Sequence, residues 1–286
     1  GHLSEVSGIG AKRRDMLQEL GIHGLNDLAT ANPERLAVQM ERFGEQHGDV
    51  AGALVAQAIA QRDGLVERLD STLALPELQR APGVLLYDIE SDPDARHDFL
   101  HGFLRLPRQS DGGWDLAAAT YHPLLVLAEH GEQRSWLRLQ RLLSRYEGWP
   151  ILHYGETETL SLRRLAQRQG ASDAQLRRLK RSLIDVHARI RSHWRLPLSS
   201  YGLKSVAAWR GFRWSQSGVD GARALLWWRQ WLGEGPNRRG SRHGLEWIFL
   251  YNQDDCRATW AVAEWLLEED DLLNTAQRLD QPTAGR

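Results

Sequence analysis

The pattern of hydrophobic and polar positions divides the chain into a helical N-terminal segment, a strand-rich middle and a helical C-terminal half. Over residues 1–70, apolar positions recur at spacings of three and four and are interrupted by glycines, which is typical of several short helices. An Ala-rich stretch at 49–61 predicts one longer helix. The following segment holds Pro76 and Pro82 and predicts a linker at residues 71–82.

After the linker, the period of the pattern changes to that of strands. Residues 84–90 form a short apolar run that ends in carboxylates and predicts a buried strand. Further strands are expected at 98–106, 114–121 and 150–154. Helices are predicted at 132–146, 157–168, 173–194, 202–210, 220–232 and 243–267.

This order of elements indicates an α/β fold, in which helices flank a mixed sheet. We expect this domain to cover residues 83–272, with a small all-α domain before it. An acidic, disordered tail is expected at residues 273–286.

Composition excludes several classes of protein. The 286 residues are 42% hydrophobic, which is too much for a disordered chain. No apolar run is long enough to cross a membrane, so no membrane partner is expected. The single cysteine, Cys256, excludes a disulfide framework and a multi-cysteine zinc site, and it fits the cytoplasm, where we expect the protein to act. The chain begins with Gly1 and His2 rather than Met, so the natural protein is expected to extend further.

The net charge of −1 conceals an uneven distribution of charged residues. Residues 131–213 contain 17 Lys and Arg against 6 Asp and Glu, whereas residues 264–280 contain six acidic residues and one Arg. Nearly all of the basic residues are Arg, whose forked guanidinium suits phosphate, although the base composition of a genome produces the same bias. Charge alone therefore leaves phosphate binding and a solvated surface open.

A glycine-rich segment near the N-terminus indicates backbone contacts with phosphate. Gly8 and Gly10 allow a tight turn before a helix, whose first amide groups then face outward. The basic residues that follow are Lys12, Arg13 and Arg14. Residues 3–29 resemble a helix-hairpin-helix DNA-binding motif, which contacts the backbone without reading sequence. The alternative is a helical hairpin that serves only for docking or spacing.

Acidic side chains from distant segments are the main candidates for chemistry. Asp88 and Glu90 are two apart on the first predicted strand, so both point to the same side of the sheet. They repel each other unless a divalent cation lies between them, and oxygen-only ligands suit Mg²⁺ or Mn²⁺. Tyr251 and Asp255 are four apart on the last long helix and share a face. Asp254 points about 100° away and is expected to face solvent.

A third segment, where a strand meets a helix, supplies another carboxylate. Glu158 falls in the first turn of the predicted helix and is able to reach the same pocket, with Glu156 as its substitute. Asp185 is a further candidate near the pocket, for which we favour a structural or substrate-facing role.

The order and spacing of these motifs resemble the DEDD superfamily of 3′–5′ exonucleases, which have an RNase H-like fold. The resemblance is to the subclass whose third motif is Tyr-x-x-x-Asp, which matches Tyr251 and Asp255, while Asp88 and Glu90 match the first motif. The second motif differs from the superfamily pattern, because Glu158 occupies the position where the superfamily usually has Asp.

Within this superfamily the chain is similar to the YprB-type group. That group has segments similar to residues 153–158, 200–204 and 251–255. In related bacterial proteins such a domain follows a RecB-like nuclease domain, which is therefore an expected N-terminal partner.

The resemblance implies metal-dependent hydrolysis of phosphodiester bonds from the 3′ end of single-stranded nucleic acid. DNA is favoured because of the hairpin module, and RNA remains open. The residues that the resemblance implies to be catalytic are Asp88, Glu90, Glu158, Tyr251 and Asp255, of which the four carboxylates hold two Mg²⁺ or Mn²⁺ ions and the tyrosine orients the attacking water. The alternative is a catalytically inactive binding or docking module of a larger RecB-like nuclease.

Further nucleic-acid contacts are expected from a turn and from the basic helices. Tyr201 and Lys204 lie in a Ser-Tyr-Gly-Leu-Lys turn, and Lys204 is the best single candidate for a phosphate contact. The basic helix residues are Arg163, Arg164, Arg168, Arg177, Arg178, Lys180, Arg181, Arg189 and Arg191. The candidates for stacking on bases are Trp209, Trp214, Trp227 and Trp228. Core packing of the tryptophans and a solvated charged face are the alternatives.

Overall fold

The computed structural model describes residues 1–233 and 238–281, in two compact units. Unit 1 comprises Gly1–Ala74 and Arg189–Val206, and unit 2 comprises Leu75–Ala188 and Ala207–Arg286. Residues 189–206 therefore belong to unit 1, although they lie far along the chain from its other residues. In the part of the chain that is described, no helix carries an apolar stretch of the length that a bilayer requires.

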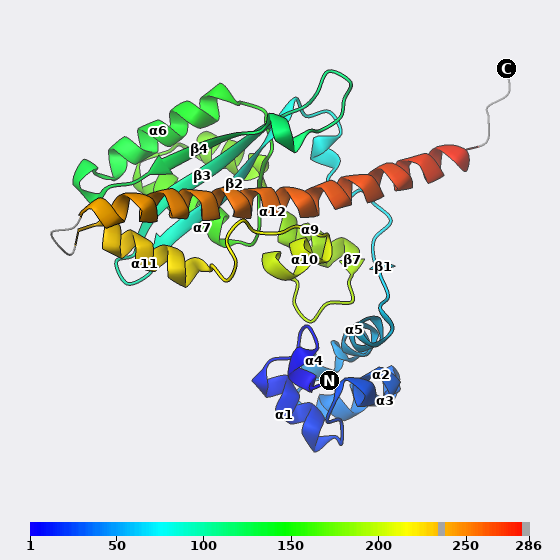
Figure 1. Ribbon diagram of the computed structural model, residues 1–286. Coiled ribbons are helices and arrows are strands. Elements are labelled where there is room, and N and C mark those ends of the chain that lie inside the picture. Colours follow the sequence, from blue (N-terminus) through cyan, green and yellow to red (C-terminus); the bar gives the residue numbers. More distant parts are fainter. Residues whose placement is uncertain (234–237, 282–286) are drawn as a thin grey trace, which may run out of the picture. The chain divides into compact units, whose positions relative to one another are not determined.

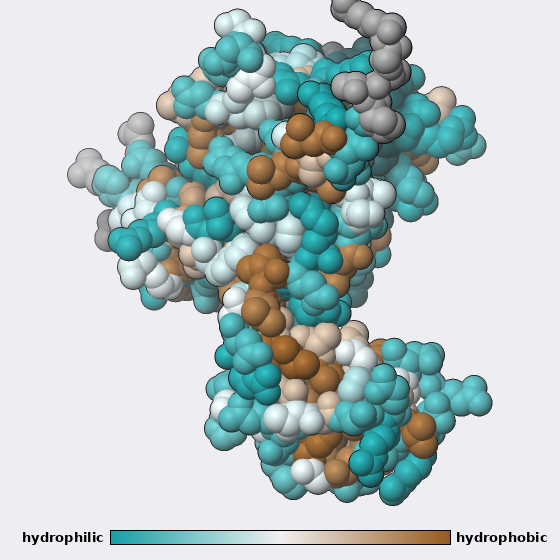
Figure 2. Space-filling view, turned by 90° about the vertical axis from the view of Figure 1, so that its right-hand side faces the viewer, coloured by the Kyte–Doolittle hydropathy of each residue, from teal (hydrophilic) through white to brown (hydrophobic). Residues whose placement is uncertain are grey.

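Unit 1 is built mainly from short helices (Figure 1). They are η1 (Leu3–Glu5), α1 (Ala11–Glu19), α2 (Leu25–Thr30), α3 (Pro33–Met40), η2 (Glu41–Phe43), α4 (Glu45–Gly48) and α5 (Ala51–Asp63). Leu17, Leu28, Leu36 and Met40 are fully buried in its core. The short strand β1 (Glu67–Arg68) pairs with β7 (Trp194–Arg195). The surface of this unit carries hydrophobic residues among hydrophilic ones (Figure 2).

The core of unit 2 is a five-stranded mixed sheet with the order β4-β3-β2-β5-β6. Its strands are β2 (Gly83–Asp92), β3 (His97–Pro107), β4 (Thr120–Leu125), β5 (Ile151–His153) and β6 (Leu183–Asp185). The first three form an antiparallel meander, and β5 and β6 run parallel to β2. The predicted α/β fold with a mixed sheet is therefore confirmed.

Helices cover both faces of this sheet. One face packs on α6 (Glu132–Arg145), α7 (Thr157–Arg168) and α8 (Asp173–Ser182), through a core that includes Leu85 and Phe103. The other face packs on α11 (Gly221–Trp231) and α12 (Arg238–Leu279), where Trp228 stacks on Phe99 at 4.3 Å. Helix α12 lies along the sheet in Figure 1 and contacts β2, β3 and β5. The remaining elements are η3 (Pro76–Leu78), η4 (Leu116–Ala118), η5 (Ala128–His130), α9 (Val186–His193) and α10 (Leu203–Trp209).

The structure corrects the extent of a predicted strand and of a predicted helix. The strand expected at 114–121 begins only at Thr120, because Asp115 accepts a hydrogen bond from the amide of Ala117 and caps η4. The helix expected at 173–194 is broken into α8, β6 and α9. Its middle segment pairs with β5, and the side chain of Asp185 accepts hydrogen bonds from the amides of Gly155 and Ala188. These bonds attach the side chain of Asp185 to the turn after β5 and to the first turn of α9.

The C-terminal helix is longer than its apolar pattern indicates. Helix α12 continues to Leu279, so residues 273–279 of the expected acidic tail are helical. The segment carries Leu, Ala, Gln and Arg, which favour helix even where the side chains are exposed. The end of the expected tail, residues 282–286, lies outside the described residues.

Candidate metal centre

Three carboxylates from β2 and α12 converge in unit 2. Asp88 and Glu90 lie on the face of β2 that is covered by α12, which carries Asp255. One carboxylate oxygen from each of the three lies within 4.8 Å of the others. Residues separated by more than 160 positions in the chain thus form one acidic cluster.

Burial and mutual repulsion raise the pKa values of the carboxyl groups in this cluster. Burial raises the pKa of Asp88 well above its ordinary value, and the charges of Asp255, Glu90 and Glu158 raise it further. Burial and the charge of Asp255 likewise raise the pKa of Glu90 to about 8. Asp88 also shares a hydrogen bond with Glu90. In the absence of a cation, the cluster therefore holds a proton at neutral pH.

An asparagine anchors the cluster from α12. The side-chain amide of Asn252 donates hydrogen bonds to Oδ2 of Asp88 at 3.0 Å and to its backbone carbonyl at 3.2 Å. Its Oδ1 accepts a hydrogen bond of 2.6 Å from the hydroxyl of Tyr121 on β4. The amide fits here because Gly102, which pairs with Asp88, has no Cβ that would collide with it. A glycine inside a strand often marks the close approach of another group. Gly102 is therefore the feature of the sequence that indicates this contact.

A loop before α11 holds the helix side of the cluster. The indole Nε1 of Trp214 donates a hydrogen bond of 2.8 Å to Oδ1 of Asp255. The backbone amide and hydroxyl of Ser215 donate to the two carboxylate oxygens of Asp254. The expectation that Asp254 faces solvent is wrong, since this residue is only 4% exposed. The loop therefore contacts α12 at two successive acidic residues.

Glu158 lies near the cluster, in the first turn of α7. It is buried, and its charge raises the pKa of both Asp88 and Glu90. Burial raises its own pKa to about 7, although hydrogen bonds from its own amide and that of Ile89 favour the charged form. Glu156, the substitute considered from sequence, is exposed.

The neighbour of Glu158 is a neutral histidine. Nδ1 of His153 lies 3.8 Å from Oε2 of Glu158, but it donates at 2.7 Å to the carbonyl of Gly155. Its Nε2 then accepts the hydroxyl of Thr159 at 3.0 Å. Burial lowers the pKa of His153, so this contact is not an ion pair.

Tyr251 lies one helical turn before Asp255 and is 5% exposed. Burial and then the charges of Asp255, Glu90 and Asp88 raise the pKa of its phenol. In the absence of a cation, the phenol is therefore protonated at neutral pH.

The donor set of this site fits a hard divalent cation. All its ligand atoms are carboxylate oxygens, which Mg²⁺ and Mn²⁺ prefer. Oε1 of Glu90 and Oε2 of Glu158 are buried without a hydrogen-bond partner, which costs free energy unless a cation or a proton satisfies them.

The nucleic-acid contacts expected near the N-terminus lie in unit 1. Gly8 has a φ of 91° in the turn before α1, and Gly10 is the N-cap residue of that helix. Before the turn, the structure has only the three-residue η1. Lys12 is exposed, and the guanidinium of Arg13 donates at 2.8 Å to the carbonyl of Gly8.

The Ser-Tyr-Gly-Leu-Lys turn also belongs to unit 1. The hydroxyl of Tyr201 donates to Gln57 and accepts from the amide of Leu196, both at 2.7 Å. These bonds join α5 to the chain after β7. Lys204 is exposed at the start of α10.

The tryptophans proposed for base stacking have different surroundings. Trp228 is core, since it is buried against Phe99. The indole of Trp214 donates its hydrogen bond to Asp255. Trp209 and Trp227 are half-buried beside other tryptophans.

Among the basic helix residues, three have partners within the protein. Arg168 pairs with Glu132, and Arg189 donates to the carbonyl of Ala74. Arg178 lies 3.8 Å from Glu147. Over the described residues 1–233 and 238–281, those that are exposed without such a bond are Arg163, Arg164, Arg177, Lys180, Arg181 and Arg191.

Comparison with known proteins gives one family. A family model described as RNase_H superfamily (RNase_H_2) matches residues 85–267, which include every carboxylate of the site. No curated protein and no solved structure matches the chain.

Proposed function

Because the chain belongs to the RNase H superfamily, we propose that unit 2 is a metal-dependent 3′–5′ exonuclease that hydrolyses the phosphodiester bonds of single-stranded nucleic acid. The observation that carries this proposal is the cluster of Asp88, Glu90 and Asp255, whose carboxylate oxygens lie within 4.8 Å of one another. Such a cluster is costly without a cation, so its presence favours a role in binding one.

Asp88, Glu90 and Asp255 hold the cations, and Glu158 approaches them from α7. Bound Mg²⁺ or Mn²⁺ supplies an activated water and stabilises the charge of the leaving oxygen. The protonated phenol of Tyr251 orients the attacking water by a hydrogen bond. Asn252 and Trp214 fix the carboxylates of Asp88 and Asp255 in position.

DNA is the favoured substrate, and RNA is the other. The preference rests on Gly8, Gly10, Lys12 and Arg13, which we propose to be a helix-hairpin-helix contact with a DNA backbone. Tyr201 and Lys204 are proposed to contribute a further phosphate contact. The RecB-like nuclease domain expected from the resemblance would be a partner in the same chain.

The test is degradation of labelled oligonucleotides. DNA and RNA strands labelled at the 5′ or the 3′ end are incubated with the protein in Mg²⁺, Mn²⁺ or EDTA. We expect stepwise shortening of 5′-labelled strands with metal and none with EDTA. Asp88→Asn should abolish it, while Glu129→Gln, a change of an exposed carboxylate, should leave it intact.

The alternative is a nucleic-acid-binding module that does not cut. The glutamate at position 158 favours it, because the family pattern usually has the shorter aspartate there. Intact strands with both wild type and Asp88→Asn, together with equal binding of those strands, would establish this alternative and reject hydrolysis.

A further inference from the structure

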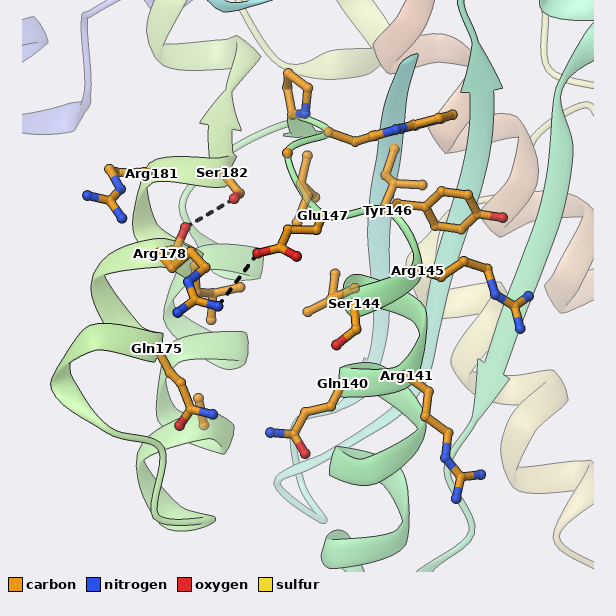
Figure 3. A pocket seen from close by; sticks show the side chains of 18 of the residues that line it. Gln140, Arg141, Ser144, Arg145, Tyr146, Glu147, Gln175, Arg178, Arg181 and Ser182 are labelled. Atoms are coloured by element: carbon orange, nitrogen blue, oxygen red, sulfur yellow. Dashed lines mark hydrogen bonds and ion pairs between the residues drawn. The ribbon is translucent and has the colours of Figure 1, made fainter. Parts of the chain in front are cut away.

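A group of basic side chains lies on the α6 side of the sheet. It consists of Arg105 on β3, His122 on β4, and Arg141 and Arg145 on α6. Within residues 1–233 and 238–281, no hydrogen bond or ion pair joins any of these three arginines to a carboxylate. In Figure 3, Arg141 and Arg145 both point away from α8. We call these four residues the cationic cluster.

Aromatic rings and burial hold two members of the cluster in place. The guanidinium of Arg105 lies 5.4 Å from the ring centre of Tyr146 and 5.3 Å from that of Trp149. Rings attract a cation but leave its N–H groups able to donate. Nε2 of His122 is buried without a hydrogen-bond partner. Burial and the charges of Arg105 and Arg145 lower the pKa of His122.

The cluster is therefore the electrostatic opposite of the metal centre. The positive charges of its arginines repel one another and lower the pKa of His122, and a bound anion would remove that repulsion. Three separate guanidinium groups suit a ligand with repeated negative charge. Guanidinium also matches the geometry of phosphate oxygens.

The sheet topology places the cluster near the carboxylates. Strand β4 is at the edge of the sheet, and its consecutive residues Tyr121 and His122 point to opposite faces. Tyr121 bonds Asn252, which bonds Asp88, so the metal centre is on one face and His122 on the other. Along β3, Arg105 lies three residues from Gly102, the partner of Asp88, which is roughly 10 Å.

We propose that Arg105, His122, Arg141 and Arg145 bind the phosphate backbone of a nucleic-acid strand that passes over the β4 edge to the metal centre. The proposal rests on the proposed function for the identity of the strand. A cavity of about 1010 Å³ lies between α6 and α8 and is lined in part by Trp149. Arg141 and Arg145 lie at its border, with their side chains directed away from α8 (Figure 3). The cavity is at the upper end of the roughly 300–1,000 Å³ typical of ligand pockets, and it gives the bases of the strand apolar surface and an aromatic ring to contact.

The experiment measures binding without hydrolysis. The full chain carrying Asp88→Asn is titrated, in EDTA, into fluorescent single-stranded DNA and RNA, and anisotropy is recorded at several salt concentrations. The same titration is repeated with a chain that carries Arg141→Gln and Arg145→Gln in addition to Asp88→Asn. The matched control is Arg223→Gln/Arg278→Gln, which removes the same charge from exposed residues of α11 and α12.

We expect the Arg141/Arg145 pair of substitutions to weaken binding roughly tenfold and to lower the salt slope by about 1.4, since each strand phosphate contributes about 0.7. The control pair should change binding less than twofold. Equal losses in both pairs, or no loss in either, would overturn the proposal. So would a preference of the wild-type cluster for an acidic peptide over the oligonucleotide.

Failure of the proposed hydrolysis gives a different result. If the wild-type chain binds strands through Arg141 and Arg145 but never cuts them, the binding proposal stands and the nuclease proposal falls. If it cuts strands and the Arg141/Arg145 variant binds and cuts as the wild type does, only the binding proposal falls. Thermal melting of each variant checks that these exposed substitutions leave the fold intact.

Discussion

The indole of Trp214 donates a hydrogen bond of 2.8 Å to the carboxylate of Asp255, across 41 positions of the chain. Its ring also packs edge-on against Phe212, with centroids 4.8 Å apart. The next residue, Ser215, binds Asp254 through its amide and hydroxyl. The loop is thus attached at two successive acidic residues of α12, and it determines how the carboxylate of Asp255 is turned.

Trp214→Phe tests this positioning role. The substitution keeps an aromatic ring against Phe212 but removes the N–H donor, so Asp255 loses its orientation. We expect metal-dependent cleavage to fall roughly 10- to 100-fold, with a loss in unfolding free energy of only about 1 kcal/mol. Single-turnover cleavage and urea melts measure the two effects. Trp247→Phe, at a 47% exposed site, is the control, and an equal loss of activity there would contradict the role.

The raised pKa of Glu90 predicts how stability depends on pH in EDTA. Because its pKa is about 8 in the folded protein and 4.5 ordinarily, the folded state binds more protons than the unfolded state between these values. The free energy of unfolding must therefore fall as pH rises from about 5 to 8. We expect Glu90→Gln to flatten this decline and to be more stable than wild type at pH 8, as measured by Tm.

The control for this measurement is Glu129→Gln, which changes a carboxylate that is 75% exposed. Its pH profile should follow that of wild type. Excess Mn²⁺ should raise the Tm of wild type most at high pH, because the cation replaces the protons of the cluster. A wild-type Tm that rises between pH 5 and 8 in EDTA, relative to Glu90→Gln, would exclude the raised pKa.

Much of the mixed sheet could be predicted from local pattern, because an apolar run such as residues 84–90 marks a buried strand directly. The same holds for the long apolar helix that carries Tyr251 and Asp255. Strand β6 could not be predicted, since its three residues become a strand only by pairing with β5.

The supports of the site were missed for a similar reason. As an aromatic residue, Trp214 was predicted to stack on bases. Only the folded chain brings its N–H group to Asp255. Asn252 lies between Tyr251 and Asp255, to which the sequence motif assigns the chemistry. In the folded chain its side chain joins Asp88 to Tyr121. Hydrogen bonds between distant segments leave no periodic signal in the sequence.

Gly102→Ala should disrupt the site through Asn252. A Cβ at this position would collide with the side-chain amide of Asn252, and so α12 or the amide must move. We expect a loss of about 2–4 kcal/mol in unfolding free energy, as overpacking and a displaced buried hydrogen bond combine. The stabilisation by Mn²⁺ should be lost as well.

The matched test for Gly102→Ala is rescue by a smaller partner. Asn252→Ala alone removes the hydrogen bonds to Asp88, but it makes room for the new methyl group. The double variant should therefore be more stable than Gly102→Ala alone, as measured by urea melts. Additive losses would mean that the two positions do not meet in the protein.

Glu158→Gln tests whether α7 contributes a ligand. The amide keeps the size of the side chain but removes the charge, so we expect cleavage to fall at least about 100-fold, which corresponds to nearly 3 kcal/mol of lost transition-state stabilisation. Stability in EDTA should not fall at pH 8, because the buried carboxylate has a pKa of about 7 and is charged there at a cost. The control is Glu156→Gln, which changes an exposed carboxylate two residues before Glu158. Loss of cleavage in Glu156→Gln with full activity in Glu158→Gln would assign the third segment's ligand to Glu156 instead.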